Sequence, residues 1–322
     1  MKRLLMTIAA ALSLCLAPIL AHAQSWPQKQ IKMIVPFPPG GGTDFIGRLA
    51  AKHLSERLGQ QVYVENRGGA NGAIGLQALM QSDPDGYTIG AISDGPMIAN
   101  PALYDKLAYQ PLRDFIPVAR MIKFPSMLVA NPAVPVRNVA ELIAHAKAHP
   151  GQLTYSSGGI GNFSHLGLEL LAHQTNIKLL HVPYRGIGPA TQALLAGEVN
   201  LTYNNVATAL EHVRAGKMIS LAIGEPQRLP ALPDIPAIAE TVPGFEMAAW
   251  VGIFVPAKTS KDVVARLAKE TAAFLNDPEV AKLFAQQQII ASFKEPDESA
   301  QFIGQELVKW DKVIKTLGIK GE

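Results

Sequence analysis

The stretch IKMIVPFPPGGGTDFIGRLAAKHLSERL, at Ile31–Leu58, decides the fold prediction. Its β-branched beginning, Ile31–Phe37, predicts a strand, which the prolines and glycines of Pro38–Asp44 end. From Phe45 onward apolar residues recur with helical spacing as far as Leu58. A strand, a glycine-rich loop and a helix in this order are typical of an α/β protein.

The same order of elements returns in the second half of the chain. LTYSSGGIGNFSHLGLEL, at Leu153–Leu170, again has a short strand pattern, a glycine loop and apolar residues at helical spacing. Other β-branched runs, such as Gln61–Glu65, Tyr87–Ile92 and Leu179–Val182, also alternate with helical patterns. This alternation predicts two lobes, each with a central, mainly parallel sheet flanked by helices.

Length and composition agree with two folded domains. The 322 residues are 48% hydrophobic and 17% charged, which excludes a disordered chain. The net charge of +3, without a run of Lys or Arg, excludes an ordinary nucleic-acid binder. The proline-rich segment Ile122–Pro135 predicts a crossover between lobes. We expect one domain from residues 24–125 plus 249–322, and a second from residues 126–248.

Residues 1–23 have the pattern of a cleavable export signal. Lys2 and Arg3 precede the apolar run Leu4–Leu20, and Ala21–Ala23 (AHA) forms a cleavage site. We therefore expect a periplasmic protein whose mature chain carries a charge near +1. The single cysteine, Cys15, lies in this segment, which excludes disulfides and cysteine-ligated metals from the mature chain.

The two glycine loops indicate anion binding. The first turn of a helix carries free N–H groups and a partial positive charge, and glycine lets a ligand approach the backbone closely. Gly40–Thr43 and Gly158–Asn162 each precede a predicted helix. In a parallel sheet such loops lie at the carboxyl ends of the strands, where open α/β folds bind ligands. Facing each other across a cleft, the loops would suit a small carboxylate or dicarboxylate.

Several side chains near these loops have a structural and a functional interpretation. Thr43 is a candidate N-cap, and Asp44 fits the first helical turn but could instead receive a ligand amine. For Asn162 and Ser164, capping of a helix is the favoured role and donation to a ligand is the alternative.

Polar residues also follow other predicted strands, and we expect them at the same carboxyl ends of the sheets as the two glycine loops. Arg185 could clamp a carboxylate or lie on the surface, and Asn204–Asn205 could equally belong to a turn. The candidate ligand-binding residues are Phe37, Pro39, Gly40, Gly41, Thr43, Asp44, Ser93, Asp94, Ser157, Gly159, Asn162, Ser164, His165, Tyr184, Arg185 and Asn204.

Catalytic motifs are absent from the sequence. There is no nucleophile elbow, Walker loop or zinc-protease helix. His145 and His149 are spaced to share a metal, but an exposed helix face is the alternative, since no third ligand is near in sequence. An exported hydrolase or transferase would need Ser164 with His165, and adjacent helical residues point about 100° apart. We expect no enzyme, no metal and no cofactor.

Several motifs resemble those of the tripartite tricarboxylate transporter receptors, also called the Bug family. They include IVPFPPGGGTD at Ile34–Asp44, HVPYRG at His181–Gly186 and LPDIPAIAETVPGFE at Leu232–Glu246. The resemblance covers essentially the whole mature chain. It departs at Asp94–Gly95, where many members have a small residue or histidine, and at Asn200, where aspartate is usual.

This resemblance implies a periplasmic binding protein of the type II fold that closes around a small organic carboxylate. It implies ligand capture by main-chain amides and waters, in loops that match Phe37–Thr43 and Ser157–His165. The implied partners are the membrane subunits of a tripartite tricarboxylate transporter. A sensor that passes its signal to another protein is an alternative role, and we expect a monomer. Closure is expected near residues 122–130 and 245–252. Gly41→Pro or Gly159→Pro, each removing an N–H donor, is expected to abolish binding.

Overall fold

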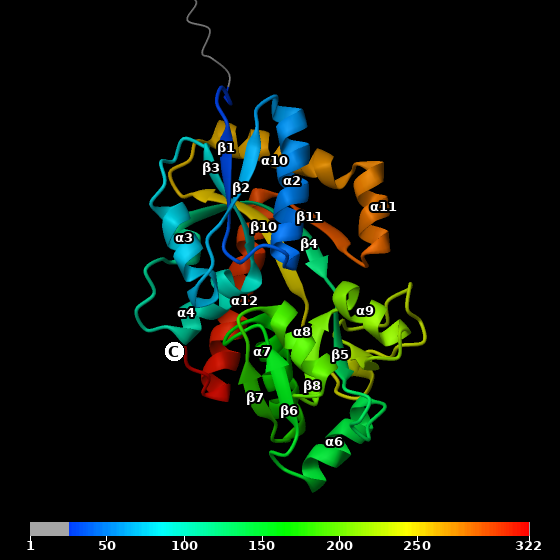
Figure 1. The fold of residues 1–322 in the computed structure, drawn as a ribbon. Helices are drawn as coiled ribbons and strands as arrows, with labels where there is room; N and C mark the ends of the chain where they lie inside the picture. The colour runs from blue at the N-terminus through cyan, green and yellow to red at the C-terminus, as the bar shows by residue number, and fades with distance from the viewer. Residues whose placement is uncertain (1–25, 322) are drawn as a thin grey trace, which may run out of the picture.

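Two separate β-sheets, each covered by helices, divide residues 26–321, the part of the chain that this computed structural model describes, into two lobes (Figure 1). The predicted export signal lies outside the described residues. Lobe 1 contains the six-stranded sheet, in the order β11–β4–β10–β3–β1–β2, and lobe 2 the five-stranded sheet, in the order β7–β6–β8–β5–β9.

Lobe 1 takes its strands from both ends of the chain. They are β1 (Ile31–Val35), β2 (Val62–Asn66), β3 (Thr88–Ser93), β4 (Phe115–Phe124), β10 (Ala249–Pro256) and β11 (Ile290–Lys294). Its helices are α2 (Gly42–Leu58), α3 (Ala73–Met80), α4 (Asn100–Leu103), α5 (Pro111–Asp114), α10 (Lys261–Leu275), α11 (Pro278–Gln286) and α12 (Pro296–Leu317). None of the helices within residues 26–321 combines the length and hydropathy that a bilayer crossing requires.

Lobe 2 is built from the middle of the chain. Its strands are β5 (Ser126–Ala130), β6 (Thr154–Ser157), β7 (Leu180–Pro183), β8 (Leu201–Asn205) and β9 (Ile219–Ile223). Its helices are α6 (Val139–Ala148), α7 (Phe163–Thr175), α8 (Ile187–Ala196) and α9 (Val206–Arg214).

The sheets are mixed, whereas the sequence pattern predicts mainly parallel ones. β1 pairs in parallel with β2 and β3, and β6 with β7 and β8, as the strand–helix alternation predicts. β10 runs antiparallel to both β3 and β4, and β5 runs antiparallel to β8 and β9. The reason is that β5 and β10 each begin at the lobe boundary, so they enter their sheets from the opposite end.

The crossings between lobes are tied together by buried hydrogen bonds. Ser126, the first residue of β5, donates to Met247 O, and Tyr203 donates to the same oxygen at 2.7 Å. Gly224, just after β9, donates to Ser126 O at 2.8 Å and accepts from Met247 N at 3.0 Å. Tyr203 is fully buried. These bonds join the strand that enters lobe 2 to the segments that leave it.

Candidate functional site

The start of α2 presents unpaired main-chain donors at the lobe boundary. Gly41 is the N-cap, with no side-chain cap, and the N–H groups of Gly41, Gly42, Thr43 and Asp44 have no acceptor within residues 26–321. A Cβ placed on Gly40 or on Gly41 would meet no atom within 4 Å. Lobe 1 therefore has four unpaired donors at this helix start, with open space beside Gly40 and Gly41 and with Phe124 and Asn205 beside Gly42.

Asp44 fixes this loop from within. Its Oδ2 accepts from Gly40 N at 3.0 Å and from Arg48 Nε at 2.9 Å, and its Oδ1 accepts from Asn66 Nδ2 at 2.8 Å. Burial raises the pKa of Asp44, but the hydrogen bonds from Arg48, Gly40 and Asn66 outweigh burial and lower it. The carboxylate is charged and already receives three donors, as expected for a structural first-turn residue. The prediction that Thr43 is the N-cap is wrong, because the helix begins earlier than the apolar pattern indicates.

On lobe 2, the side chains of the second glycine loop pair with its own amides. Asn162 is the N-cap of α7 and accepts from Ser164 N at 3.1 Å, which confirms its predicted capping role. Ser164 Oγ accepts from Gly158 N at 2.9 Å and donates to Asn162 Oδ1 at 2.8 Å. Ser164 is fully buried, so its hydroxyl holds the loop in place.

The remaining glycines of this loop are bound in the same way. Gly159 N donates to Ser157 Oγ at 3.1 Å, and Gly161 N donates to His165 Nδ1 at 3.2 Å. The Gly159→Pro expectation is therefore wrong in its reason: that N–H is already used, and φ at Gly159 is 117°, which proline cannot adopt. In the loop, among the described residues, only the amides of Ile160 and Phe163 lack an acceptor.

A buried stack of rings supports the loop from below. His181 lies between His165, at 4.1 Å between ring centroids, and Tyr155, at 4.8 Å. His181 Nε2 and Ser157 Oγ are 2.6 Å apart. This serine–histidine pair was missed in the sequence, because it depends on the parallel register that aligns Tyr155 with His181. His181 has no further hydrogen bond among residues 26–321, so no third group orients it as in a catalytic triad.

Burial makes both histidines poor bases. Burial, with a smaller effect from His181, lowers the pKa of His165 to about 3, and burial lowers the pKa of His181 to about 4. Below pH 6.5 the histidines of the unfolded chain take up a proton, whereas in the native protein both side chains stay neutral until the pH falls toward 4. Their contribution to stability is therefore complete above pH 6.5 and falls as the pH decreases toward 4.

We expect His165→Asn to remove part of this acid sensitivity. Asparagine keeps an acceptor for Gly161 N but does not titrate. Between pH 7 and pH 5 the wild-type protein should lose about 2 kcal/mol of unfolding free energy relative to the variant. Urea unfolding at both pH values measures this difference. The comparison needs the variant because burial raises the pKa of Asp94 to about 7, and that shift adds stability as the pH falls. Parallel pH profiles for the two proteins would contradict the prediction.

Asp94 lies against β10 and α12. It is 4% exposed and lines a cavity of about 170 Å³ together with Trp250 and with Glu306 and Trp310 of α12. Ser93, the last residue of β3, is also buried and makes no side-chain hydrogen bond within residues 26–321.

The remaining predicted side chains are distributed around the boundary. Phe37 accepts from Asn66 Nδ2 through its carbonyl, and Pro39 is exposed. Tyr184 donates to Glu198 at 3.3 Å, and Arg185 is exposed without an ion pair or hydrogen bond in the described part of the chain. Asn204 points into lobe 2, where its Nδ2 donates to Thr191 at 2.8 Å.

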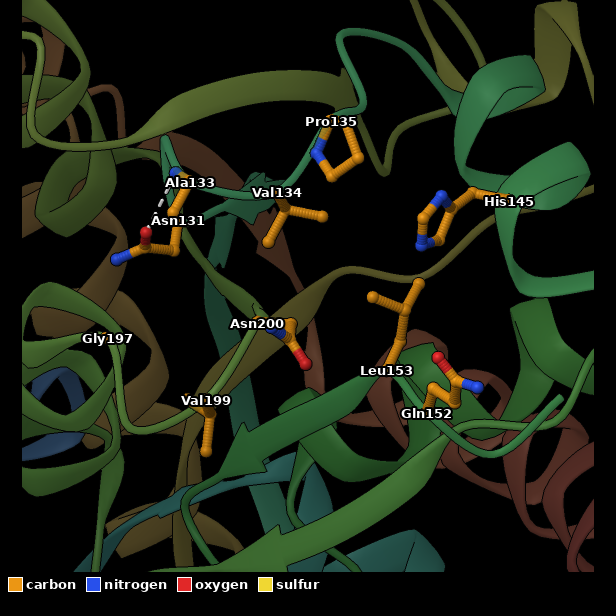
Figure 2. A pocket seen from close by; sticks show the side chains of 10 residues that line it. All are labelled: Asn131, Ala133, Val134, Pro135, His145, Gln152, Leu153, Gly197, Val199 and Asn200. Carbon is orange, nitrogen blue, oxygen red and sulfur yellow. Dashed lines mark hydrogen bonds between the residues drawn. The ribbon is translucent and has the colours of Figure 1, made fainter. Parts of the chain in front are cut away.

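A second cavity, of about 300 Å³, is lined by residues of lobe 2 that include Asn131, Leu153 and Asn200 (Figure 2). Asn131 and Asn200 in its wall already hydrogen-bond to Leu194 O and Thr154, so they offer little to a ligand. It contains none of the predicted site residues. His145 also lines it, and although the rings of His145 and His149 are 4.8 Å apart, residues 26–321 contain no group of three or more metal-ligating side chains.

Two lobes joined by crossing strands, with unpaired amides at their boundary, define a solute-binding protein of the periplasmic type. The chain belongs to the tripartite tricarboxylate transporter family receptors, whose family model matches residues 46–319. This confirms the resemblance found in the sequence.

Named relatives and solved structures agree with this assignment. Protein BugT of Bordetella pertussis is 35% identical over 306 residues, which are 94% of this chain and 93% of BugT. The structure of R. palustris Rpa4515 with adipate is 33% identical, with a TM-score of 0.87 over 92% of this chain and 99% of that one. MatC from Rhodopseudomonas palustris with bound malate is 30% identical, with a TM-score of 0.82 over 90% of this chain and all of MatC. The two-lobed α/β fold predicted from the sequence is thereby confirmed.

Proposed function

We propose that this chain is an extracytoplasmic receptor that binds a small organic carboxylate at the boundary between its lobes. The observation that carries the proposal is the set of four unpaired N–H groups at the start of α2, next to the open space beside Gly40 and Gly41. A helix start has a partial positive charge and attracts carboxylates. The adipate and malate found in related structures support this ligand class.

We further propose that the receptor works in the periplasm, as a monomer, and delivers its ligand to the membrane subunits of a tripartite tricarboxylate transporter. Family membership and the export signal pattern support this role. The two domains, residues 24–125 plus 249–322 and residues 126–248, would close by bending near Ser126, Gly224 and Met247. A ligand that contacts both lobes shifts the population toward the closed form.

A panel of mono-, di- and hydroxycarboxylates tests the proposal by thermal shift and calorimetry. A ligand that binds only the native protein adds about 2.7 kcal/mol of stability at 100 times its Kd, so Tm must rise with concentration. The diamides of the same acids are the control, because they keep the carbon skeleton and lack the charge; they should leave Tm unchanged. Equal shifts by acids and diamides, or turnover of a substrate without any shift, would reject a carboxylate receptor.

A further inference from the structure

Asn205 has a side chain that none of its local structure uses. It ends β8 and is the N-cap residue of α9, where an asparagine ordinarily accepts from a first-turn amide. Here it forms no cap. Asn205 is 7% exposed, and its Oδ1 is fully buried without a partner among residues 26–321. An unpaired buried acceptor is unfavourable, so this oxygen needs a donor that the described residues do not supply.

The Asn205 amide reaches across the lobe boundary to the start of α2. Its Nδ2 is 3.5 Å from the position that a Cβ on Gly42 would take, next to the ring of Phe124. The preceding Asn204 points the opposite way and is bonded to Thr191, as the alternation of side chains along a strand requires. Asn205 therefore lies beside the same unpaired amides that carry the proposed function.

A plain carboxylate can satisfy only half of this side chain. Carboxylate oxygens accept hydrogen bonds, so they pair with the amides of α2 and with Asn205 Nδ2, but they leave Oδ1 unpaired. A hydroxyl or ammonium group on the carbon next to the carboxylate supplies the missing donor. Asp44 does not compete for this donor, because its carboxylate already receives three hydrogen bonds.

We propose that Asn205 makes this receptor selective for 2-hydroxy or 2-amino carboxylates over the same acids without that group. The inference rests on the proposed function, since it assumes that the carboxylate binds at α2. A site with a buried group that only one of two similar ligands can pair discriminates strongly between them. The expected preference is about 10- to 100-fold in Kd.

The experiment is calorimetry on the mature protein with two matched pairs, malate against succinate and glutamate against glutarate. At least one substituted acid should bind ten or more times tighter than its partner. Asn205→Leu, which keeps the size of the side chain, should reduce that ratio to within twofold. Asn205→Asp, which keeps the acceptor, should weaken every acid by adding a negative charge but retain the preference.

Three results overturn the inference. The first is binding of both members of each pair within twofold by the wild-type protein. The second is a Kd ratio in Asn205→Leu that equals the wild-type ratio. If Asn205→Leu does not fold, loss of the preference in Asn205→Asp overturns the inference in its place. The third is the absence of binding by all four acids and by every other carboxylate in the panel, and this result rejects the proposed function as well. The first result, equal affinity within each pair, rejects only the role of Asn205.

Discussion

The Gly41→Pro variant is expected to bind carboxylates about 100-fold more weakly than the wild-type protein. Proline removes one of the four unpaired donors at the start of α2, and a hydrogen bond to a charged group contributes about 1.5–3 kcal/mol. The ring also occupies the open space beside residue 41. The φ of −84° at Gly41 is close to the proline value, so lobe 1 should still fold. Calorimetry with the tightest acid of the panel measures the effect.

Gly41→Ala is the matched control. Alanine keeps the N–H, fits the same φ, and its Cβ meets no atom within 4 Å. Its Kd should stay within threefold of wild type, with an unchanged Tm in the absence of ligand. Wild-type affinity in Gly41→Pro would mean that the acid is held elsewhere.

Gly224→Ala is expected to lower the free energy of unfolding by about 3 kcal/mol. A Cβ at this position would overlap Tyr203 Oη and Ser126 Oγ, which are buried and hydrogen-bonded. Neither side chain can move aside without breaking the bonds to Met247 O, which tie together the segments that cross between the lobes. Urea unfolding followed by circular dichroism measures the loss.

Two variants isolate this mechanism. Gly188→Ala lies in α8, is exposed and meets nothing within 4 Å, so it should be neutral or add up to about 1 kcal/mol. Adding Tyr203→Phe to Gly224→Ala removes the overlapping hydroxyl and should recover part of the lost stability, a non-additive result. Equal urea midpoints for Gly224→Ala and wild type would show that the crossing tolerates the methyl group.

The local order of elements was predictable, because it follows from periodicity and from glycine and proline. The prediction for Ile31–Leu58 gave the strand, the loop and the helix, although α2 begins at Gly42, three residues before its apolar stripe. The antiparallel direction of β10 was not predictable from alternation, because it depends on which lobe the chain comes from.

The side chains of the site were harder to predict than its loops. Strand alternation indicates that Asn204 and Asn205 face opposite ways, but only the packed structure shows which of them faces lobe 1. The pairing of Gly159 with Ser157 is likewise a property of rotamers within the loop. Such contacts leave no periodic signal in a single sequence.

The unequal supply of free amides assigns different kinetic roles to the two halves of the molecule. Four donors stand ready on α2, whereas the glycine loop before α7 has only the amides of Ile160 and Phe163 without an acceptor in the described chain. We therefore expect an incoming acid to dock first on α2 and the other half to arrive afterward. Substitutions near Gly41 would then slow capture, and those near Ile160 would shorten the residence time.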